Sequence, residues 1–312
     1  MSEGLPLQGI PLEDLNATLT AKKVRSKAQP IRLCLPQLSI NGLSETWLLK
    51  QCGAIHWEEL STAFGVPPES MSDSQGNRLY PSFIALRLKG GPLSAFREGD
   101  NVRFAITLEQ VSRTRYLSRQ CVQTDSGSAS VSIEMLTSFL RREKLRDNSV
   151  LTAGDLRSMR PIQADLPKNR HCDLVEVDQV IRSCKWTEYE GYLREPSASD
   201  FAFRYSPSPF SDFNGAGLLY FAQYQDIVDR AEWALHGETP MLAATTVERQ
   251  LFYFANCNPG DSVQVSLMSF RATGDGISYR AQLTRCSDNH LMAEVFTRKS
   301  FDSAHRAHQG LN

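Results

Sequence analysis

Residues 214–233 read NGAGLLYFAQYQDIVDRAEW, and a weakly similar stretch, NGLSETWLLKQCGAIHWEEL, occupies residues 41–60. Both begin with Asn-Gly and continue with the apolar spacing of a long amphipathic helix, so that Trp47 corresponds to Tyr220. Sequence rich in β-forming residues follows each copy. The recurrence predicts a duplicated unit of one helix and one sheet, with a site between the two copies.

A second match supports the duplication. Glu98-Gly99-Asp100 precedes a predicted strand in the first copy, and Pro259-Gly260-Asp261 precedes one in the second. Helix, turn and strands therefore recur in the same order. Because the helix must bury an apolar stripe and the sheet one face, we expect an α+β unit in which a curved sheet wraps the helix.

Patterns of apolar residues and turns predict the elements and their grouping. We expect helices at 44–64 and 215–235, extended segments at 173–180 and 201–205, and strands at 80–88, 101–110, 115–123, 128–139, 246–255, 262–272, 276–285 and 290–301. The predicted organisation is an N-terminal arm (1–30), a first unit (31–145), a charged and polar linker (146–172), a second unit (173–303) and a C-terminal tail (304–312).

The composition is that of an ordinary globular protein. The chain has 312 residues, of which 41% are hydrophobic and 22% charged, with a formal net charge of −1. This length suffices for two domains, and the charge does not favour a nucleic-acid partner. No apolar run reaches the roughly 18 residues that span a membrane. The N-terminus has acidic residues and lacks the pattern of a secretory signal, so we expect a cytoplasmic protein.

The cysteines and histidines do not suggest a metal site. Seven cysteines stand at positions 34, 52, 121, 172, 184, 257 and 286, and none form a C-x-x-C pair. Their odd number and spacing argue against a disulfide framework and against zinc. We expect reduced thiols and no metal.

Three segments resemble a known family: GLSETWLLKQCGAIHW (42–57), NRLYPSFIALRL (77–88) and SPFSDFNGAGLLYFAQYQDIVDRAEW (208–233). They resemble the hot-dog thioesterase superfamily and, within it, the bifunctional acyltransferase/decarboxylase family of the leinamycin polyketide pathway and its relatives. The resemblance covers residues 33–301. It implies a double hot-dog fold, with two tandem units that each wrap an antiparallel sheet around a long helix.

The resemblance also implies a function. Members of that family take a methylmalonyl group from coenzyme A onto a tyrosine, decarboxylate it and deliver the acyl group to an acyl carrier protein. It therefore implies acyl-CoA and acyl carrier protein as partners, no cofactor beyond the coenzyme A thioester substrate, and Tyr80 as the nucleophile. Malonyl and methylmalonyl groups both remain open, and so does pairing into a homodimer.

Tyr80 has a physical context of its own. Pro81 restricts Tyr80 to extended backbone and cannot donate to a sheet, which indicates a strand start or an edge. A phenol with a pKa of about 10 is a poor nucleophile near neutrality, so a positive neighbour would have to help. Arg78 and Arg87 are the nearest candidates in sequence. The structural alternative is a buried tyrosine with a satisfied hydroxyl.

The two predicted helix starts are candidate binding sites for the thioester oxygen. The candidates are Gly42, Leu43 and Ser44 in the first copy and Asn214, Gly215 and Gly217 in the second. Unpaired amides at a helix start can hold an anionic oxygen, such as that of the enolate formed by decarboxylation. Ordinary helix capping by Ser or Asn is the alternative.

Other residues support rival functions. A carboxylate near a helix start, Asp212 or Glu45, would be the base or nucleophile of a plain thioesterase or dehydratase. A third possibility is an acyl or carrier-protein binding module without catalysis.

We expect His56 to be packed in the core, and the aromatic run Tyr220-Phe221-x-x-Tyr224 to belong to the core as well.

Overall fold

The computed structural model describes residues 25–26, 29–157, 159, 161–162, 166–167, 172–195, 201–237 and 242–301. Most of the predicted N-terminal arm and the whole predicted tail lie outside these residues. The strands of the first half are β1 (Arg25–Ser26), β2 (Ile31–Arg32), β5 (Tyr80–Lys89), β6 (Asn101–Gln110), β7 (Arg115–Thr124), β8 (Ser130–Lys144) and β9 (Asp147–Ala153). Those of the second half are β12 (Phe201–Tyr205), β13 (Ala244–Tyr253), β14 (Val263–Thr273), β15 (Gly276–Arg285) and β16 (His290–Phe301).

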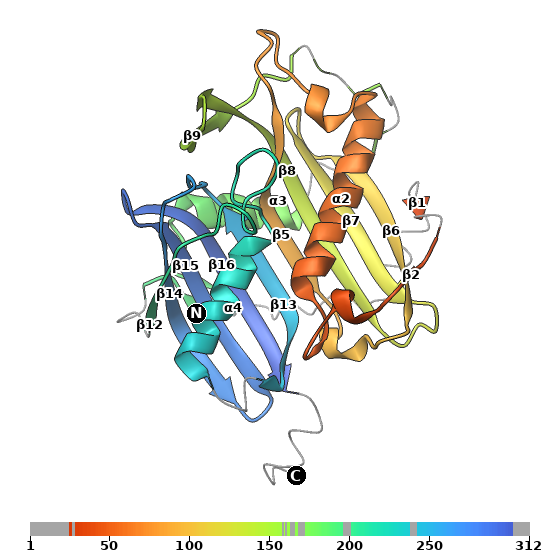
Figure 1. The fold of residues 1–312 in the computed structure, drawn as a ribbon, viewed down its shortest axis with the longest axis vertical. Helices are drawn as coiled ribbons and strands as arrows, with labels where there is room; N and C mark the ends of the chain where they lie inside the picture. Colours follow the sequence, from red (N-terminus) through yellow and green to blue (C-terminus); the bar gives the residue numbers. More distant parts are fainter. Residues whose placement is uncertain are drawn as a thin grey trace, which may run out of the picture.

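These twelve strands form one antiparallel sheet that runs through both halves (Figure 1). Its order is β1-β6-β7-β8-β5-β13-β16-β15-β14-β12, with β2 on β6 and β9 on β8. The halves join where β5 pairs with β13, from Lys89 opposite Glu248 to Ala85 opposite Phe252. Because the order repeats outward from this seam, the sheet has pseudo-two-fold symmetry. The predicted α+β double hot-dog fold is confirmed.

Helix α2 (Glu45–Phe64) begins and ends where the sequence predicts. Ser44 caps it by accepting a hydrogen bond from the backbone N of Trp47, and Gly65 ends it with φ of +69°. Gly53 lies mid-helix, where a Cβ atom would come within 2.7 Å of Cζ of Phe221. The glycine therefore lets a side chain of the second half approach the first helix closely.

Helix α4 (Gln223–His236) starts eight residues later than predicted. The expected helical turn from Gly215 is a loop, in which the backbone N of Gly217 donates to Asn214 O (2.8 Å) and the backbone N of Asn214 donates to Leu218 O (2.9 Å). Helices α2 and α4 lie on the same face of the sheet (Figure 1). Their apolar faces share one core, which includes Leu48, Leu49, Ile227 and Val228.

Two further expectations were wrong. Residues 173–180, expected to be extended, belong to helix α3 (Asp173–Ser183), which packs on β5, β8 and β13 from the face opposite α2 (Figure 1). The predicted linker 146–172 contains β9, which forms a hairpin with β8 and enlarges the sheet.

Among the described residues, no helix is long and apolar enough to cross a membrane.

Candidate functional site

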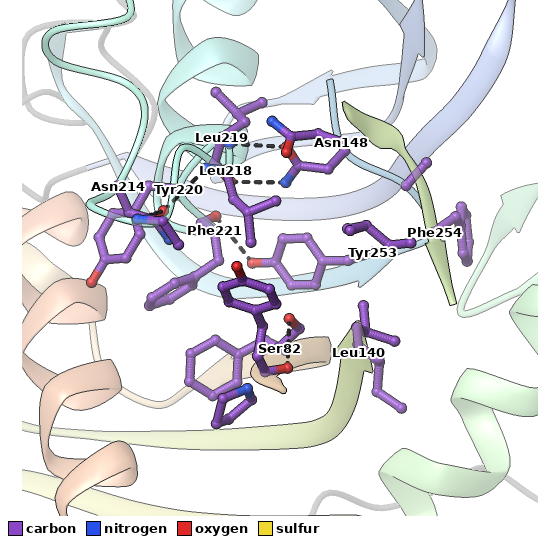
Figure 2. A pocket seen from close by; sticks show the side chains of 18 of the residues that line it. Ser82, Leu140, Asn148, Asn214, Leu218, Leu219, Tyr220, Phe221, Tyr253 and Phe254 are labelled. Carbon is purple, nitrogen blue, oxygen red and sulfur yellow. Dashed lines mark hydrogen bonds between the residues drawn. The ribbon is translucent and has the colours of Figure 1, made fainter. Parts of the chain in front are cut away.

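A cavity of about 440 Å³ lies where the two halves meet. Its lining includes Trp57 of α2, residues 78–84 at the start of β5, residues 148–151 of β9, Asn214, Ala216 and residues 218–221 of the loop before α4, and residues 253–256 after β13. Figure 2 shows Asn214, Leu218 and Phe221 facing Ser82 and Leu140 across this space. The cavity is therefore built by both units, as the duplication predicts.

Tyr80 is the first residue of β5 and lines this cavity in a half-buried position. Two guanidinium groups lie against its ring, Arg78 at 5.1 Å and Arg142 at 5.3 Å from the ring centre. Arg142 also donates a hydrogen bond from Nη1 to Tyr80 Oη, with a length of 3.4 Å. The positive neighbour that a reactive phenol requires is thus present, although only Arg78 was among the sequence candidates.

Arg87, the other sequence candidate, lies away from Tyr80. Its guanidinium binds Glu134 at 3.3 Å and Asp173 at 2.5 Å, beneath helix α3. A strand rises about 3.3 Å per residue, so the seven positions from Tyr80 to Arg87 separate the two residues by roughly 23 Å along β5. Closeness in the sequence was therefore a poor guide to which arginine meets the phenol.

Arg142 is held in place from two sides. Its Nη2 donates to Asn148 Oδ1 and to Ala216 O, both at 2.8 Å. Asn148 also donates from Nδ2 to Gly217 O at 2.6 Å, which fixes the loop before α4 against β9. Sequence analysis missed Arg142 because its hairpin fell partly in the predicted linker. The β-forming run at residues 149–153, after the turn-forming residue types Asp147 and Asn148, was the available signal.

Four amide groups of the loop before α4, those of Ala216 to Leu219, are already hydrogen-bonded. Asn214 Oδ1 accepts from the backbone N of Ala216 (3.0 Å) and of Leu218 (3.1 Å), and Asn256 Oδ1 accepts from that of Leu219 (2.9 Å). Asn214 O accepts from the backbone N of Gly217. Asn214 thus shapes a loop at the cavity wall and does not cap a helix, contrary to the predicted helix start. These amides are not free to hold a substrate oxygen.

Aromatic side chains from both halves make the apolar wall. Phe83 stacks on Trp57 with ring centres 5.4 Å apart, and its edge meets Phe221 at 4.5 Å. Tyr220 lies beside Phe221 at 4.8 Å, and burial raises the pKa of Tyr220 to about 12. The run Tyr220-Phe221-x-x-Tyr224 belongs to the core as predicted, and it also lines the cavity.

The charges around the cavity are of one sign. Among the described residues that line it, none is Asp or Glu, whereas Arg78 and Arg182 are present near Tyr80 and at the seam. Arg182 reaches in from α3 and donates to Ile84 O (2.9 Å) and Tyr253 O (2.6 Å), at the point where β5 and β13 stop pairing. The charged side chains of the described lining are thus arginines, and it offers no carboxylate base.

The predicted site residues of the first copy lie at the start of α2, near a second cavity of about 310 Å³. Leu43 and Ser44 line this second cavity, together with Glu45 and with Asp229 of α4. Gly42 begins the short strand β4 (Gly42–Leu43) with φ of +93°, where a Cβ atom would be 2.3 Å from Leu93 O. The first-copy candidates are thus separated from Tyr80 and do not form one site with it.

Ion pairs occupy the surroundings of the second cavity. Arg249 is fully buried and binds Glu45 from Nε and Asp229 from Nη2, both at 2.8 Å. Lys299 binds Asp229 at 2.9 Å and Glu232 at 2.8 Å. Burial raises the pKa of Glu45, and the charge of Arg249 opposes this rise. Each of these carboxylates has a cationic partner, which is the arrangement of a structural network.

The other candidate carboxylate and the candidate histidine are structural. Asp212 Oδ2 accepts hydrogen bonds from Tyr205 Oη (2.9 Å) and from the backbone N of Ser208 (2.7 Å). These bonds tie the end of β12 to the loop before α4. His56 lies fully buried between Ser118 Oγ at 2.7 Å and Thr137 Oγ1 at 2.6 Å. Burial lowers the pKa of His56 to about 3, so it is neutral in the core, as the sequence predicts.

The fold occurs in solved structures of thioesterases. A protein from Lactobacillus plantarum, provisionally described as an oleoyl thioesterase, superposes with a TM-score of 0.64 at 12% identity, covering 90% of this chain and 97% of that one. The 12:0-ACP thioesterase from Umbellularia californica gives 0.63 at 10% identity, covering 89% and 98%. An acyl-ACP thioesterase from Bacteroides thetaiotaomicron gives 0.57 at 12% identity, covering 89% and 98%.

These likenesses establish the fold that the chain shares with hot-dog thioesterases. No protein-family model and no curated protein sequence matches the chain. The activity must therefore be argued from the cavity itself.

Proposed function

We propose that this chain is an acyl-thioester enzyme that transfers a malonyl or methylmalonyl group from coenzyme A to Tyr80, decarboxylates it and passes the product to an acyl carrier protein of polyketide biosynthesis. The observation that carries the proposal is the phenol of Tyr80, in hydrogen-bond contact with a guanidinium, at a cavity whose described lining has no carboxylate. Two of the structural neighbours are described as acting on acyl-ACP, which supports a thioester substrate.

The proposed cycle uses the cavity as follows. Tyr80 Oη attacks the thioester carbonyl, the C–S bond breaks, and the coenzyme A thiolate takes up the proton that the phenol releases. The bond between the α-carbon and the carboxylate carbon then breaks, CO2 leaves, and the electron pair of that bond moves onto the ester as an enolate. Water supplies a proton to the α-carbon, and the carrier thiol finally displaces Tyr80. These steps use no metal or organic cofactor.

A cavity lining without carboxylates suits this sequence of steps. A carboxylate base would activate water to hydrolyse the tyrosyl ester, and the described lining holds no such base. The aromatic wall of Trp57, Phe83 and Phe221 limits the access of water to the same space. Both effects favour transfer over hydrolysis.

Hydrolysis of an acyl thioester is the second candidate function, because the structural neighbours are described as thioesterases. Its base would have to come from outside the cavity lining, since Glu45 and Asp212 both hold structural partners. Release of free acid without transfer to the carrier would favour this function. Binding of an acyl-carrier protein without turnover would favour a non-catalytic module.

The test follows the mass of the protein during reaction with methylmalonyl-CoA, with and without carrier protein. We expect acylation of the peptide that contains Tyr80, followed by propionyl transfer to the carrier. Tyr80→Phe should lower the rate of transfer on the order of 10³-fold or more, because the nucleophile is lost. Tyr192→Phe is the matched control, since its hydroxyl binds Thr297 O on the far side of the sheet. Transfer at the parent rate by Tyr80→Phe would rule out the covalent role.

A further inference from the structure

Only one of the two cations beside Tyr80 contacts the oxygen that would react. Arg78 is exposed and lies against the ring, 5.1 Å from its centre. Arg142 is half-buried and reaches Tyr80 Oη with Nη1 at 3.4 Å. The two arginines thus offer the same charge to one phenol, in different positions. Hydrogen-bond contact with Oη distinguishes Arg142.

The surroundings fix this position before any substrate binds. Asn148 Oδ1 and Ala216 O accept from Nη2 of Arg142 at 2.8 Å, so the first half and the second half both hold the guanidinium. A charged donor that is already oriented stabilises developing negative charge without the cost of reorganisation. The backbone amides of Ala216, Gly217 and Leu218 cannot take this role, because they are hydrogen-bonded within their loop.

We infer that Arg142 is a catalytic residue whose guanidinium stabilises negative charge on Tyr80 Oη, both when the phenol attacks and when it leaves. This inference rests on the proposed acyl transfer to Tyr80. As the O–C bond forms, the phenol proton passes to the departing thiolate, and Arg142 donates a hydrogen bond to the oxygen throughout. When the carrier thiol displaces Tyr80, the oxygen leaves as a phenolate beside the same guanidinium and regains a proton from that thiol.

Arginine suits this task because it remains charged at any pH at which proteins fold. It therefore donates a hydrogen bond without taking part in the proton transfers. In attack and in departure the charge appears on the same atom, so a single fixed donor serves both steps.

The experiment measures acylation of Tyr80 with two reagents, methylmalonyl-CoA and N-acetylimidazole, in the full chain. Peptide mass spectrometry locates and times the modification, and the other tyrosines serve as internal standards. The variants are Arg142→Gln, Arg142→Lys and Arg142→Ala, with Arg78→Gln as the matched change to the other cation. A thermal melt of each variant checks folding, since Arg142 also binds the loop at Ala216.

We expect Arg142→Gln to slow acylation by methylmalonyl-CoA by about 100-fold and acetylation of Tyr80 by at least about tenfold, as for the loss of a preorganised donor. Arg142→Lys keeps the charge, so its loss of acylation rate should be smaller than that of Arg142→Gln. The loss of acylation rate in Arg78→Gln should be at least about tenfold smaller than in Arg142→Gln, because an exposed cation is screened by solvent. Methylguanidine should restore part of the rate of Arg142→Ala, which a purely structural role would not predict.

The two reagents separate this inference from the proposed function. If Tyr80 of the parent reacts with both reagents and Arg142→Gln reacts as fast as Arg78→Gln, Arg142 is not catalytic. If acetylation depends on Arg142 but the parent accepts no methylmalonyl group, the role of Arg142 in activating Tyr80 stands and the proposed substrate is wrong. If Arg142→Gln melts early, Arg142→Lys and the methylguanidine rescue decide the question.

Discussion

The two cavities lie at opposite ends of the β5–β13 seam and differ in the residues that line them. The first cavity is lined by Tyr80, the first residue of β5, and its described lining contains arginines and no carboxylate. The second cavity is lined by Ala244, the first residue of β13, and is bordered by the ion pairs of Arg249 and Lys299. At the first position of the strand, the first copy presents the phenol of Tyr80, whereas the second copy presents the methyl group of Ala244.

The comparison teaches that the Asn-Gly sequence shared by the two copies does not account for the difference between the two sites. Both α2 and α4 are preceded by an Asn-Gly segment, yet the difference in chemistry comes from the first residues of two strands and from the hairpin of β8 and β9. The second site has become a charged network that joins α2, α4, β13 and β16. We therefore expect changes at the second site to affect stability and changes at the first to affect chemistry.

The largest expected effect on stability comes from Arg249→Met. Removal of the guanidinium leaves Glu45 and Asp229 without their shared partner in a buried place, which should lower the free energy of unfolding by about 3–5 kcal/mol. Urea denaturation measures this change. The matched control is Arg230→Met, which breaks the more exposed pair with Asp226 and should cost about 1 kcal/mol or less.

The same variant tests whether the two cavities are independent. The rate of Tyr80 acylation per folded molecule should stay within about twofold of the parent in Arg249→Met, as expected for distant sites that share no partners. A large loss of that rate would show that the network controls the first cavity, and the division between stability and chemistry would be wrong.

Gly53→Ala probes the place where the first helix meets the wall of the first cavity. The added methyl group would lie 2.7 Å from Cζ of Phe221, so the ring must move. The cost of overpacking, about 1–3 kcal/mol, exceeds the gain of up to about 1 kcal/mol in helix propensity. We expect a net loss of about 1–2 kcal/mol in urea denaturation. Gly215→Ala, with open space around its Cβ, should change stability by less than about 0.5 kcal/mol.

A further expected effect is a dependence of stability on pH that belongs to the first half. Below its ordinary pKa of 6.5, His56 binds a proton in the unfolded chain but stays neutral in the folded chain down to about pH 3. The free energy of unfolding should therefore fall as pH decreases from 6.5, by up to about 1.4 kcal/mol per pH unit. Denaturation at pH 7, 6 and 5 measures this slope. An equally steep slope in His56→Gln would assign the acid sensitivity to other groups.

Much of the fold is predictable from the sequence because its elements have strong local signals. Strands β6, β15 and β16 match their predicted bounds, and Ser44 marks the start of α2. Exposed and buried residues alternate at the start of β6, and turn residues precede all three strands, so local pattern and tertiary burial agree there. The duplication then places the two units against each other.

The failures occur where local pattern and tertiary structure disagree. Helix α3 contains the β-branched residues Val175, Val177, Val180 and Ile181, and their spacing over eleven residues was mistaken for a strand. The loop at Asn214 resembles a helix start in sequence but is held by its own side chain and by Asn148. Arg142 was missed for a related reason, since its contacts with Tyr80 and Ala216 are separated by more than 60 residues in the chain.

The pairing of β5 with β13 also bears on aggregation. Alone, either half would end in a ten-residue strand with an unpaired backbone edge, and β5 contains the apolar run Phe83 to Leu86. Exposed edges of this kind recruit strands from neighbouring molecules. In the fused chain each half covers the edge of the other, so the strands most prone to intermolecular pairing lie at the centre of the sheet.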